Sequence, residues 1–167
     1  MVNDIQNNLI KKESYFGPDN YKPLPVVLSK AKGVWAWDVD EKKYLDMMSG
    51  YSAVSHGHAH PELLRIFHEQ SSKLSLTSRA FYTDTLGPYL ETIPKMSGFD
   101  MCLPMNSGAE AVETAIKSSR RWGYRTKGVE PNKAEIIVAE GNFHGRTTTI
   151  ISFSSDENSR HDFGPHT

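Results

Sequence analysis

The chain has 167 residues, enough for one domain-sized core, with 38% hydrophobic and 23% charged residues. Its net charge of −1 and pI near 6.7 exclude a strongly basic surface for nucleic acid or an anionic membrane. The only cysteine, Cys102, excludes an intrachain disulfide. No apolar run approaches the roughly 20 residues of a membrane span, and the N-terminus lacks a signal-type apolar segment. We therefore expect a cytoplasmic protein.

The N-terminal part predicts a mixture of helix, hairpin and loop. Residues 3–16 can form a short polar helix, and the proline-rich residues 17–25 predict an extended or turning segment. Residues 33–48 predict a β-hairpin, with a turn that lacks the glycine common in two-residue hairpin turns. A small and polar loop then spans 50–60, and Pro61 opens a helix with apolar residues near one side.

The later part alternates between strand and helix patterns. The expected elements are a helix at 84–97, a strand at 99–105, a helix at 106–125 and a strand at 135–141, followed by a loop and a short segment. This order predicts an α/β fold with a parallel-type sheet and flanking helices. Two strands cannot complete such a sheet, so the pattern predicts the start of a larger domain.

The segment Asn106-Ser107-Gly108-Ala109 joins an apolar strand pattern to the clearest helix pattern. Ser or Asn can cap the helix, and Gly108 allows close approach of a ligand to the backbone. Free N–H groups and the positive end of the helix dipole favour an anion. An ordinary capped helix without a ligand is the alternative interpretation.

A second candidate loop, Gly141 to Thr147, follows the next apolar segment. Ligands of open α/β sheets bind beyond the carboxyl ends of strands. There Phe143 can stack on a flat ring, His144 can form hydrogen bonds near neutral pH, and Arg146 can bind a carboxylate in a bidentate manner. The alternative is a surface loop whose arginine is solvated.

His56, His58 and His60 alternate before Pro61 and suggest zinc. Alternating residues of an extended chain point to opposite sides, and no cysteine lies nearby. A tight turn at Gly57, with capping or packing histidines, explains the segment as well, so we expect no metal site.

Several motifs then occur in order: NYKPLPVVLSKAKGVWAWDVD, YLDMMSGYSAV, GHAHPEL, LTSRAFYTDTLG, PMNSGAEAVETAIKSSRRWGY and AEIIVAEGNFHGRTTTIISFSS. From about residue 13 onward, the chain resembles the class III aminotransferases of pyridoxal-phosphate (PLP) fold type I, most closely those that act on ornithine. The resemblance implies that residues 1–50 form an N-terminal segment of the small domain, with the β-hairpin. Residues 51–167 would begin the large PLP-binding domain.

The resemblance also implies ligand roles. PLP would be bound through the backbone of Ser107, Gly108 and Ala109 and through Phe143 and His144. Arg146 would bind the substrate α-carboxylate, and Tyr21 and Tyr51 would line the substrate site and favour ornithine over its acetylated relative. No lysine matches the family's Schiff-base position, so we expect a truncated chain without a catalytic residue.

For the full-length protein, the resemblance implies a homodimer that transfers an amino group from ornithine to 2-oxoglutarate. It would use amino-acid and 2-oxo-acid substrates and neither nucleic acid nor a membrane. Ser55-His56 departs from the usual Asn-Gln, and Phe-His-Gly also fits acetylornithine and 4-aminobutyrate aminotransferases. Those activities, or a non-catalytic split partner subunit, are the alternatives.

Overall fold

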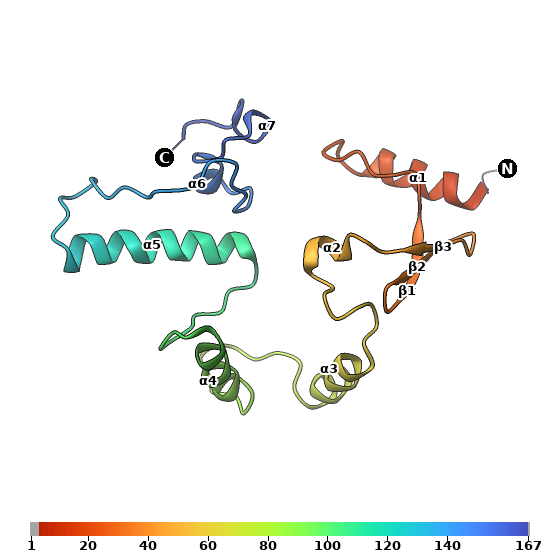
Figure 1. Ribbon diagram of the computed structural model, residues 1–167, viewed down its shortest axis with the longest axis horizontal. Helices are drawn as coiled ribbons and strands as arrows, with labels where there is room; N and C mark the ends of the chain where they lie inside the picture. Colours follow the sequence, from red (N-terminus) through yellow and green to blue (C-terminus); the bar gives the residue numbers. More distant parts are fainter. Residues whose placement is uncertain (1–3, 167) are drawn as a thin grey trace. The chain divides into compact units, whose positions relative to one another are not determined.

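The computed structural model describes residues 4–166 and divides at Phe81/Tyr82 into two compact units (Figure 1). The domain boundary expected near residue 50 concerns the small and large domains of the family and stays a prediction. Within the described range, no helix is both long and apolar enough to cross a membrane.

Helix α1 (Asp4–Phe16) matches the predicted N-terminal helix, of which residue 3 lies outside the described range. The buried side chain of Gln6 joins α1 to the extended segment after it. Its Nε2 donates to the carbonyl of Pro25 at 3.4 Å, and its Oε1 accepts the N–H of Val27 at 3.2 Å. The amide side chain of Gln6 thus pairs with one backbone donor and one backbone acceptor of a segment that forms no strand.

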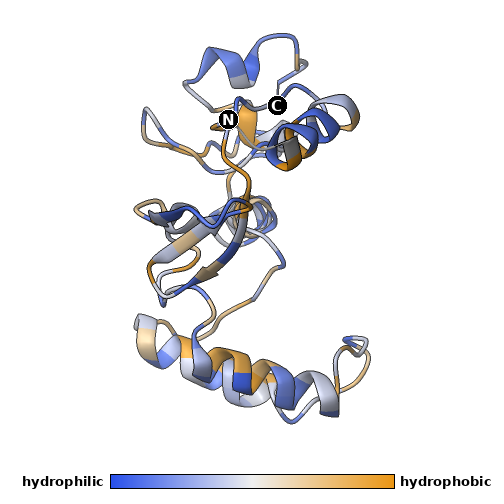
Figure 2. Cartoon of the chain, turned by 90° about the vertical axis from the view of Figure 1, so that its right-hand side faces the viewer, coloured by the Kyte–Doolittle hydropathy of each residue, from blue (hydrophilic) through white to orange (hydrophobic). Residues whose placement is uncertain are grey.

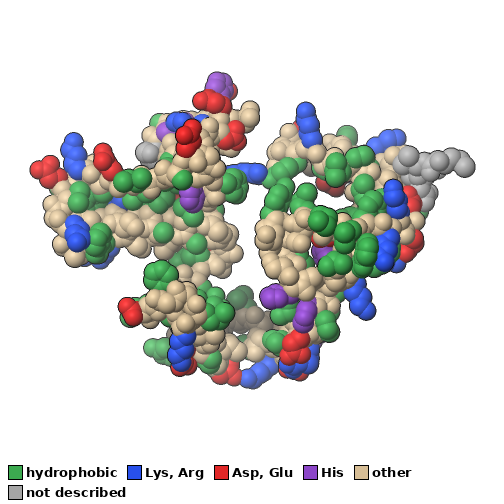
Figure 3. Space-filling model, viewed as in Figure 1, with side chains coloured by type: hydrophobic (Ala, Val, Ile, Leu, Met, Phe, Trp, Pro, Cys, Tyr) green, Lys and Arg blue, Asp and Glu red, His purple; other side chains and the backbone are tan. Residues whose placement is uncertain are grey.

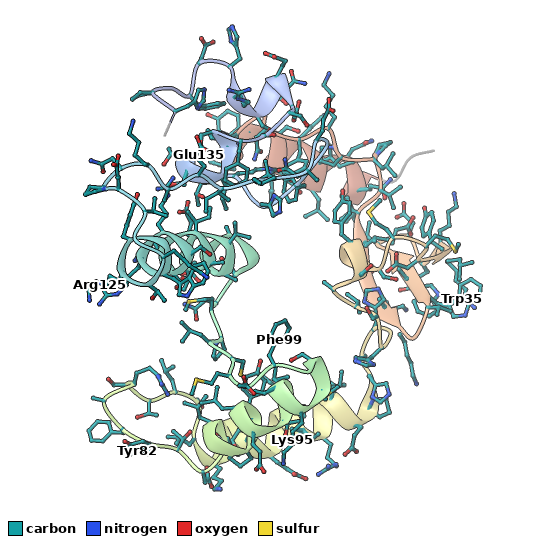
Figure 4. All side chains as sticks on the ribbon, turned by 60° about the vertical axis from the view of Figure 1, so that its left-hand side comes forward. Trp35, Tyr82, Lys95, Phe99, Arg125 and Glu135 are labelled. Atoms are coloured by element: carbon teal, nitrogen blue, oxygen red, sulfur yellow. The ribbon has the colours of Figure 1, made fainter. Side chains whose placement is uncertain are left out.

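The predicted hairpin forms, and a strand preceding it was missed. Strands β1 (Leu28–Lys32), β2 (Trp35–Asp38) and β3 (Lys43–Leu45) form an antiparallel sheet in the order β1-β2-β3. Lys32 pairs with Trp35 across the first turn, and Trp37 pairs with Lys43 across the second. The Nζ of Lys43 lies over the ring of Trp35, 3.9 Å from the ring centroid. Trp35 is labelled in Figure 4.

The buried carboxylate of Asp38 explains how the β2–β3 turn forms without glycine. It accepts the N–H groups of Asp40 and Lys42, each at 2.9 Å, and the hydroxyl of Tyr44 at 2.7 Å. Burial raises the pKa of Asp38, but these hydrogen bonds outweigh burial and hold the pKa below its usual value. Glu41 adopts the left-handed conformation in this turn, with φ 62°, and the Asp38 carboxylate holds the turn in that form.

Helices α3 (Pro61–Lys73) and α4 (Leu86–Ser97) confirm two further predictions. Pro61 occupies the first turn of α3, where its missing N–H costs nothing. Gly98 ends α4 in the left-handed conformation, with φ 76°. The predicted apolar side of α3 is solvent-exposed, including Leu63, Leu64, Phe67 and the following Leu74.

The C-terminal unit contains the long helix α5 (Gly108–Thr126) and the short helices α6 (Thr148–Ile151) and α7 (Glu157–Arg160). Helix α6 packs on α5. Ile116 of α5 and Ile150 and Ile151 of α6 are buried hydrophobic residues of this unit. This small core holds the chain after α5 against the first half of that helix.

The segments predicted as parallel strands, 99–105 and 135–141, form no β-ladder in this structure. All strand pairing found between residues 4 and 166 is antiparallel. A parallel strand needs a neighbour supplied by a distant part of the chain, whereas a hairpin supplies its own. Phe99 and Glu135 mark the two segments in Figure 4, and Phe99 is exposed.

Apolar side chains remain on the surface of both units. Figure 2 shows helices that carry apolar residues beside polar ones, and Figure 3 shows apolar side chains on the visible surface. Exposed examples include Ile137, Met101 and Leu103 of the two extended segments. Apolar surface of this extent is typical of a face that another part of a protein covers.

Candidate functional site

The start of α5 is closed by a capping box. Ser107 is the N-cap residue, and its Oγ accepts the N–H of Glu110 at 3.2 Å. The Glu110 carboxylate reaches back to the N–H groups of Asn106 and Ser107, at 2.9 and 3.0 Å. This reciprocal arrangement fixes the turn that precedes the helix.

Two further amides at this helix start face no intrahelical acceptor. Gly108 and Ala109 are the first two residues of α5, whose N–H groups have no acceptor within a helix. A Cβ added to Gly108 would meet no heavy atom of the described residues within 4 Å, so a ligand has room beside this backbone. Together with the helix dipole, the open amides fit an anionic group such as phosphate.

The loop 141–147 packs directly on this helix start. Gly145 has φ 128°, and a Cβ added there would lie 2.9 Å from the Cβ of Ala109 and 3.2 Å from Cδ1 of Ile150. Only glycine therefore fits the close approach of the loop to α5. The hydroxyl of Thr147 also donates a hydrogen bond to Glu113, one turn further along the helix.

Asn142 fixes the other end of the loop. Its Nδ2 donates to the carbonyl groups of Ala139 and Phe153, at 2.6 and 3.2 Å, and its Oδ1 lies 2.9 Å from Nδ1 of His144. The ring of His144 makes an edge-to-face contact with Phe153, with centroids 5.6 Å apart. His144 therefore makes contacts that organise the loop.

Phe143 and Arg146 lie together on the exposed side of the loop. The ring of Phe143 is 75% exposed, and the guanidinium carbon of Arg146 lies 5.8 Å from its centroid. An exposed aromatic face beside a cation can accommodate a flat, anionic ligand. The C-terminal unit thus brings together the helix start and the loop residues predicted as cofactor and carboxylate ligands.

Tyr21 and Tyr51 belong to the N-terminal unit. Tyr21 lines a cavity of about 800 Å³ formed by the end of α1 and residues 17–28. Tyr51 lies in α2 (Ser49–Ser52), a turn with φ values of 49°, 54°, 56° and 71° for its four residues. The sequence predicted a loop there and gave no sign of four successive left-handed residues.

One histidine of the predicted histidine segment contacts an aspartate. His58 Nε2 lies 2.7 Å from Asp46 Oδ2, while the rings of His56 and His60 meet edge to face, 6.3 Å apart. No group of three or more potential ligands among residues 4–166 could hold a metal ion. The expected tight turn at Gly57 is present, with φ 82°.

Sequence reasoning missed the side chains that hold these segments in place. Asp46, Asn142 and the Glu113–Thr147 contact carry no short motif, and Glu113 and Thr147 are 34 positions apart. Polar residues flanking a predicted ligand loop were the available signal, but spacing could not show which pairs meet.

Comparisons with known proteins identify the family. The family model "Aminotransferase class-III" matches residues 16–167. Ornithine aminotransferases from Brevibacillus brevis and Halalkalibacterium halodurans are 55% and 54% identical, over 96% and 94% of this chain. The chain spans 40% and 39% of the length of those relatives.

Solved structures agree in fold. The ornithine aminotransferase of Toxoplasma gondii superposes with a TM-score of 0.94 at 38% identity, covering 97% of this chain and 38% of that one. The acetylornithine aminotransferase of Elizabethkingia anophelis is 56% identical, with a TM-score of 0.79, over 92% of this chain and 38% of its own. The chain therefore belongs to the class III aminotransferases, as an N-terminal portion of their PLP fold type I architecture.

Proposed function

We propose that the full-length protein containing this chain is a PLP-dependent ornithine aminotransferase. It would convert ornithine and 2-oxoglutarate into glutamate 5-semialdehyde and glutamate. The observation that carries the proposal is the packing of loop 141–147 on the capped start of α5, with Gly145 against Ala109. This contact brings anion-binding amides, an exposed aromatic ring and a guanidinium into one region.

The residues at the start of α5 would hold the phosphate of PLP. The N–H groups of Gly108 and Ala109 would donate to phosphate oxygens. Ser107 would take part through the backbone of the turn that it caps. Glu110 already occupies the amides of Asn106 and Ser107, so it would shape the turn without blocking the next two amides.

The loop would orient the cofactor ring and the substrate. Phe143 would lie against the pyridine ring, with His144 beside it, and Arg146 would bind a substrate carboxylate through its planar fork of donors. When bound, PLP supplies an electron sink for the amino-group transfer. We assign no proton-transferring residue to this chain, whose proposed task is to bind and orient.

Ornithine is proposed as the amino donor because of the two tyrosines. The hydroxyls of Tyr21 and Tyr51 can accept hydrogen bonds from a free α-ammonium group. Acetylation of that nitrogen removes its charge and adds bulk, so the same tyrosines would disfavour acetylornithine. The 52–55% identity to several bacterial ornithine aminotransferases supports this choice.

Acetylornithine aminotransferase is the second candidate. A specific observation favours it: the Elizabethkingia anophelis protein of that activity is 56% identical over most of the chain. A non-catalytic partner subunit would instead show no turnover with any amine. We also propose that the full-length protein uses amino-acid and 2-oxo-acid substrates and is a homodimer. Light scattering in solution would test the dimer through its molar mass.

Purified full-length protein, loaded with PLP, tests the proposal. Formation of glutamate from 2-oxoglutarate is measured with ornithine, acetylornithine and 4-aminobutyrate as donors. We expect ornithine to have the highest kcat/KM, by at least about tenfold over acetylornithine. A reversed preference would contradict the ornithine assignment and support the second candidate.

A further inference from the structure

The turn that carries Tyr51 has an unfavourable backbone. Ser49, Gly50, Tyr51 and Ser52 all have positive φ, between 49° and 71°. Residues with a Cβ rarely adopt this left-handed region, because the Cβ approaches the following carbonyl oxygen. Three of the four residues have a Cβ, so the surrounding structure must hold the turn in this conformation.

Asp46 contacts the turn at its entry. Its Oδ1 accepts the N–H groups of Met48 and Ser49, each at 2.9 Å. Its Oδ2 lies 2.7 Å from His58 Nε2, whose N–H can donate to the carboxylate. The two side chains are only 19% and 29% exposed, so water competes weakly for this contact.

His58 is itself anchored to the sheet. Its backbone exchanges two hydrogen bonds with Gly33, both of 2.8 Å, at the connection between β1 and β2. A Cβ on the neighbouring Gly57 would lie 3.1 Å from Gly33 Cα, so the backbones at Gly33 and Gly57 are in close contact. Rigid contacts therefore run from the sheet through His58 and Asp46 to the turn.

The turn directs Tyr51 outward. The Tyr51 side chain is 85% exposed, although a buried tyrosine would stabilise the fold more. A simple chain reversal would be formed more easily by glycine or asparagine. The combination of a strained backbone, a side-chain clasp and an exposed tyrosine indicates that the position of Tyr51 serves a ligand.

We propose that Asp46 and His58 are positioning residues that hold Tyr51 ready to contact the amino-acid substrate. The inference rests on the substrate role proposed for Tyr51. Neither Asp46 nor His58 touches substrate in this proposal. They act through the turn, and they set the affinity for the amino donor while leaving 2-oxoglutarate recognition by other groups unaffected.

The test compares His58→Ala, His58→Gln and His56→Ala in the full-length, PLP-loaded enzyme. We expect His58→Ala to raise KM for the amino donor about tenfold, because small misplacements of a binding group are costly. Gln can place an amide donor near the original Nε2, so His58→Gln should restore most of the affinity. His56, whose ring meets that of His60 in the same segment, should leave KM unchanged when replaced.

A double-mutant cycle separates positioning from a general structural effect. Tyr51→Phe alone should raise the donor KM, and His58→Ala should add little, less than about twofold, in the Tyr51→Phe background. Full additivity of the two changes would overturn the proposal, because His58 would then act independently of Tyr51. Hydrogen exchange at the amides of Met48 and Ser49 should be about tenfold faster in His58→Ala.

If His58→Ala does not fold, Asp46→Asn takes its place, since it keeps an oxygen acceptor and removes the charge facing His58. Wild-type amide exchange and wild-type donor KM in that variant would overturn the proposal. An enzyme that prefers another amine refutes the ornithine assignment only. The same cycle, measured with that amine, still decides whether Asp46 and His58 position Tyr51.

Discussion

The segment 46–58, which includes the turn at 49–52, and the loop at residues 141–147 both carry side chains proposed to meet ligands. The two are held in place differently. The turn depends on a charged aspartate that faces His58 and on left-handed residues that have side chains. The loop depends on Asn142, on a glycine in close contact with Ala109, and on a hydroxyl bound to Glu113.

The two segments should therefore respond to different kinds of substitution. The loop depends mainly on close packing, because the space at Gly145 cannot hold a Cβ. The turn is shaped mainly by charge and hydrogen bonds around Asp46, and its exposed Tyr51 has ample room. Changes of size should therefore disrupt the loop, and changes of protonation should disrupt the turn.

The largest expected effect comes from Gly145→Val. The added side chain would collide with Ala109 and Ile150, and φ 128° is unfavourable for valine. Overpacking of this kind costs about 1–3 kcal/mol. In the full-length protein, titration followed by absorbance should show PLP affinity reduced at least about tenfold.

Gly87→Ala is the control for adding a side chain at a glycine without close neighbours. Gly87 lies in α4, where an added Cβ meets nothing within 4 Å of the described residues. Its replacement should leave PLP affinity unchanged. Equal affinity of the Gly145→Val and wild-type proteins would show that the loop does not need its contact with α5.

Acidification should affect the turn and the hairpin next. Hydrogen bonds from His58 and from the N–H groups of Ser49 and Met48 lower the pKa of Asp46, although burial opposes this. Burial raises the pKa of Asp38, but hydrogen bonds from Tyr44 and two backbone amides lower this pKa by a larger amount, so the net shift is downward. A depressed folded-state pKa stabilises the fold above the unfolded value of about 3.9, and this stability is lost as pH falls through the folded-state pKa.

Tryptophan fluorescence during acid titration measures this effect, because Trp35 and Trp37 lie in the sheet. Acid unfolding of the hairpin should begin below about pH 4 in the wild type. Asp38→Asn should flatten the pH dependence and lower stability at neutral pH. An unchanged acid transition in that variant would argue against a folding role for the Asp38 carboxylate.

The smallest expected effect is that of the capping box. Glu110→Ala removes the acceptor of two amides, and loss of a capping interaction costs about 1 kcal/mol. Thermal unfolding should show this loss, and Glu110→Gln should recover most of it. The Ala variant should also weaken PLP more than pyridoxal, which has no phosphate. Equal weakening of both would separate the cap from phosphate binding.

Local patterns predicted the four longer helices well, whereas the ligand roles of the site residues stay predictions. Pro61 and Gly98 mark helix ends, and Ser107 caps α5 as expected, because such signals act within a few residues. The extended segments 99–105 and 135–141 did not form the predicted strands, since parallel pairing requires distant partners. The Asp46–His58 clasp and the left-handed turn escaped prediction because they arise from contacts between separate elements.

The most direct test of the central claim is a crystal structure of the full-length protein with PLP. We predict phosphate oxygens about 2.7–3.2 Å from the backbone nitrogens of Gly108 and Ala109, with the Phe143 ring against the pyridine. A phosphate bound elsewhere, with those two amides facing only water, would contradict the proposed site.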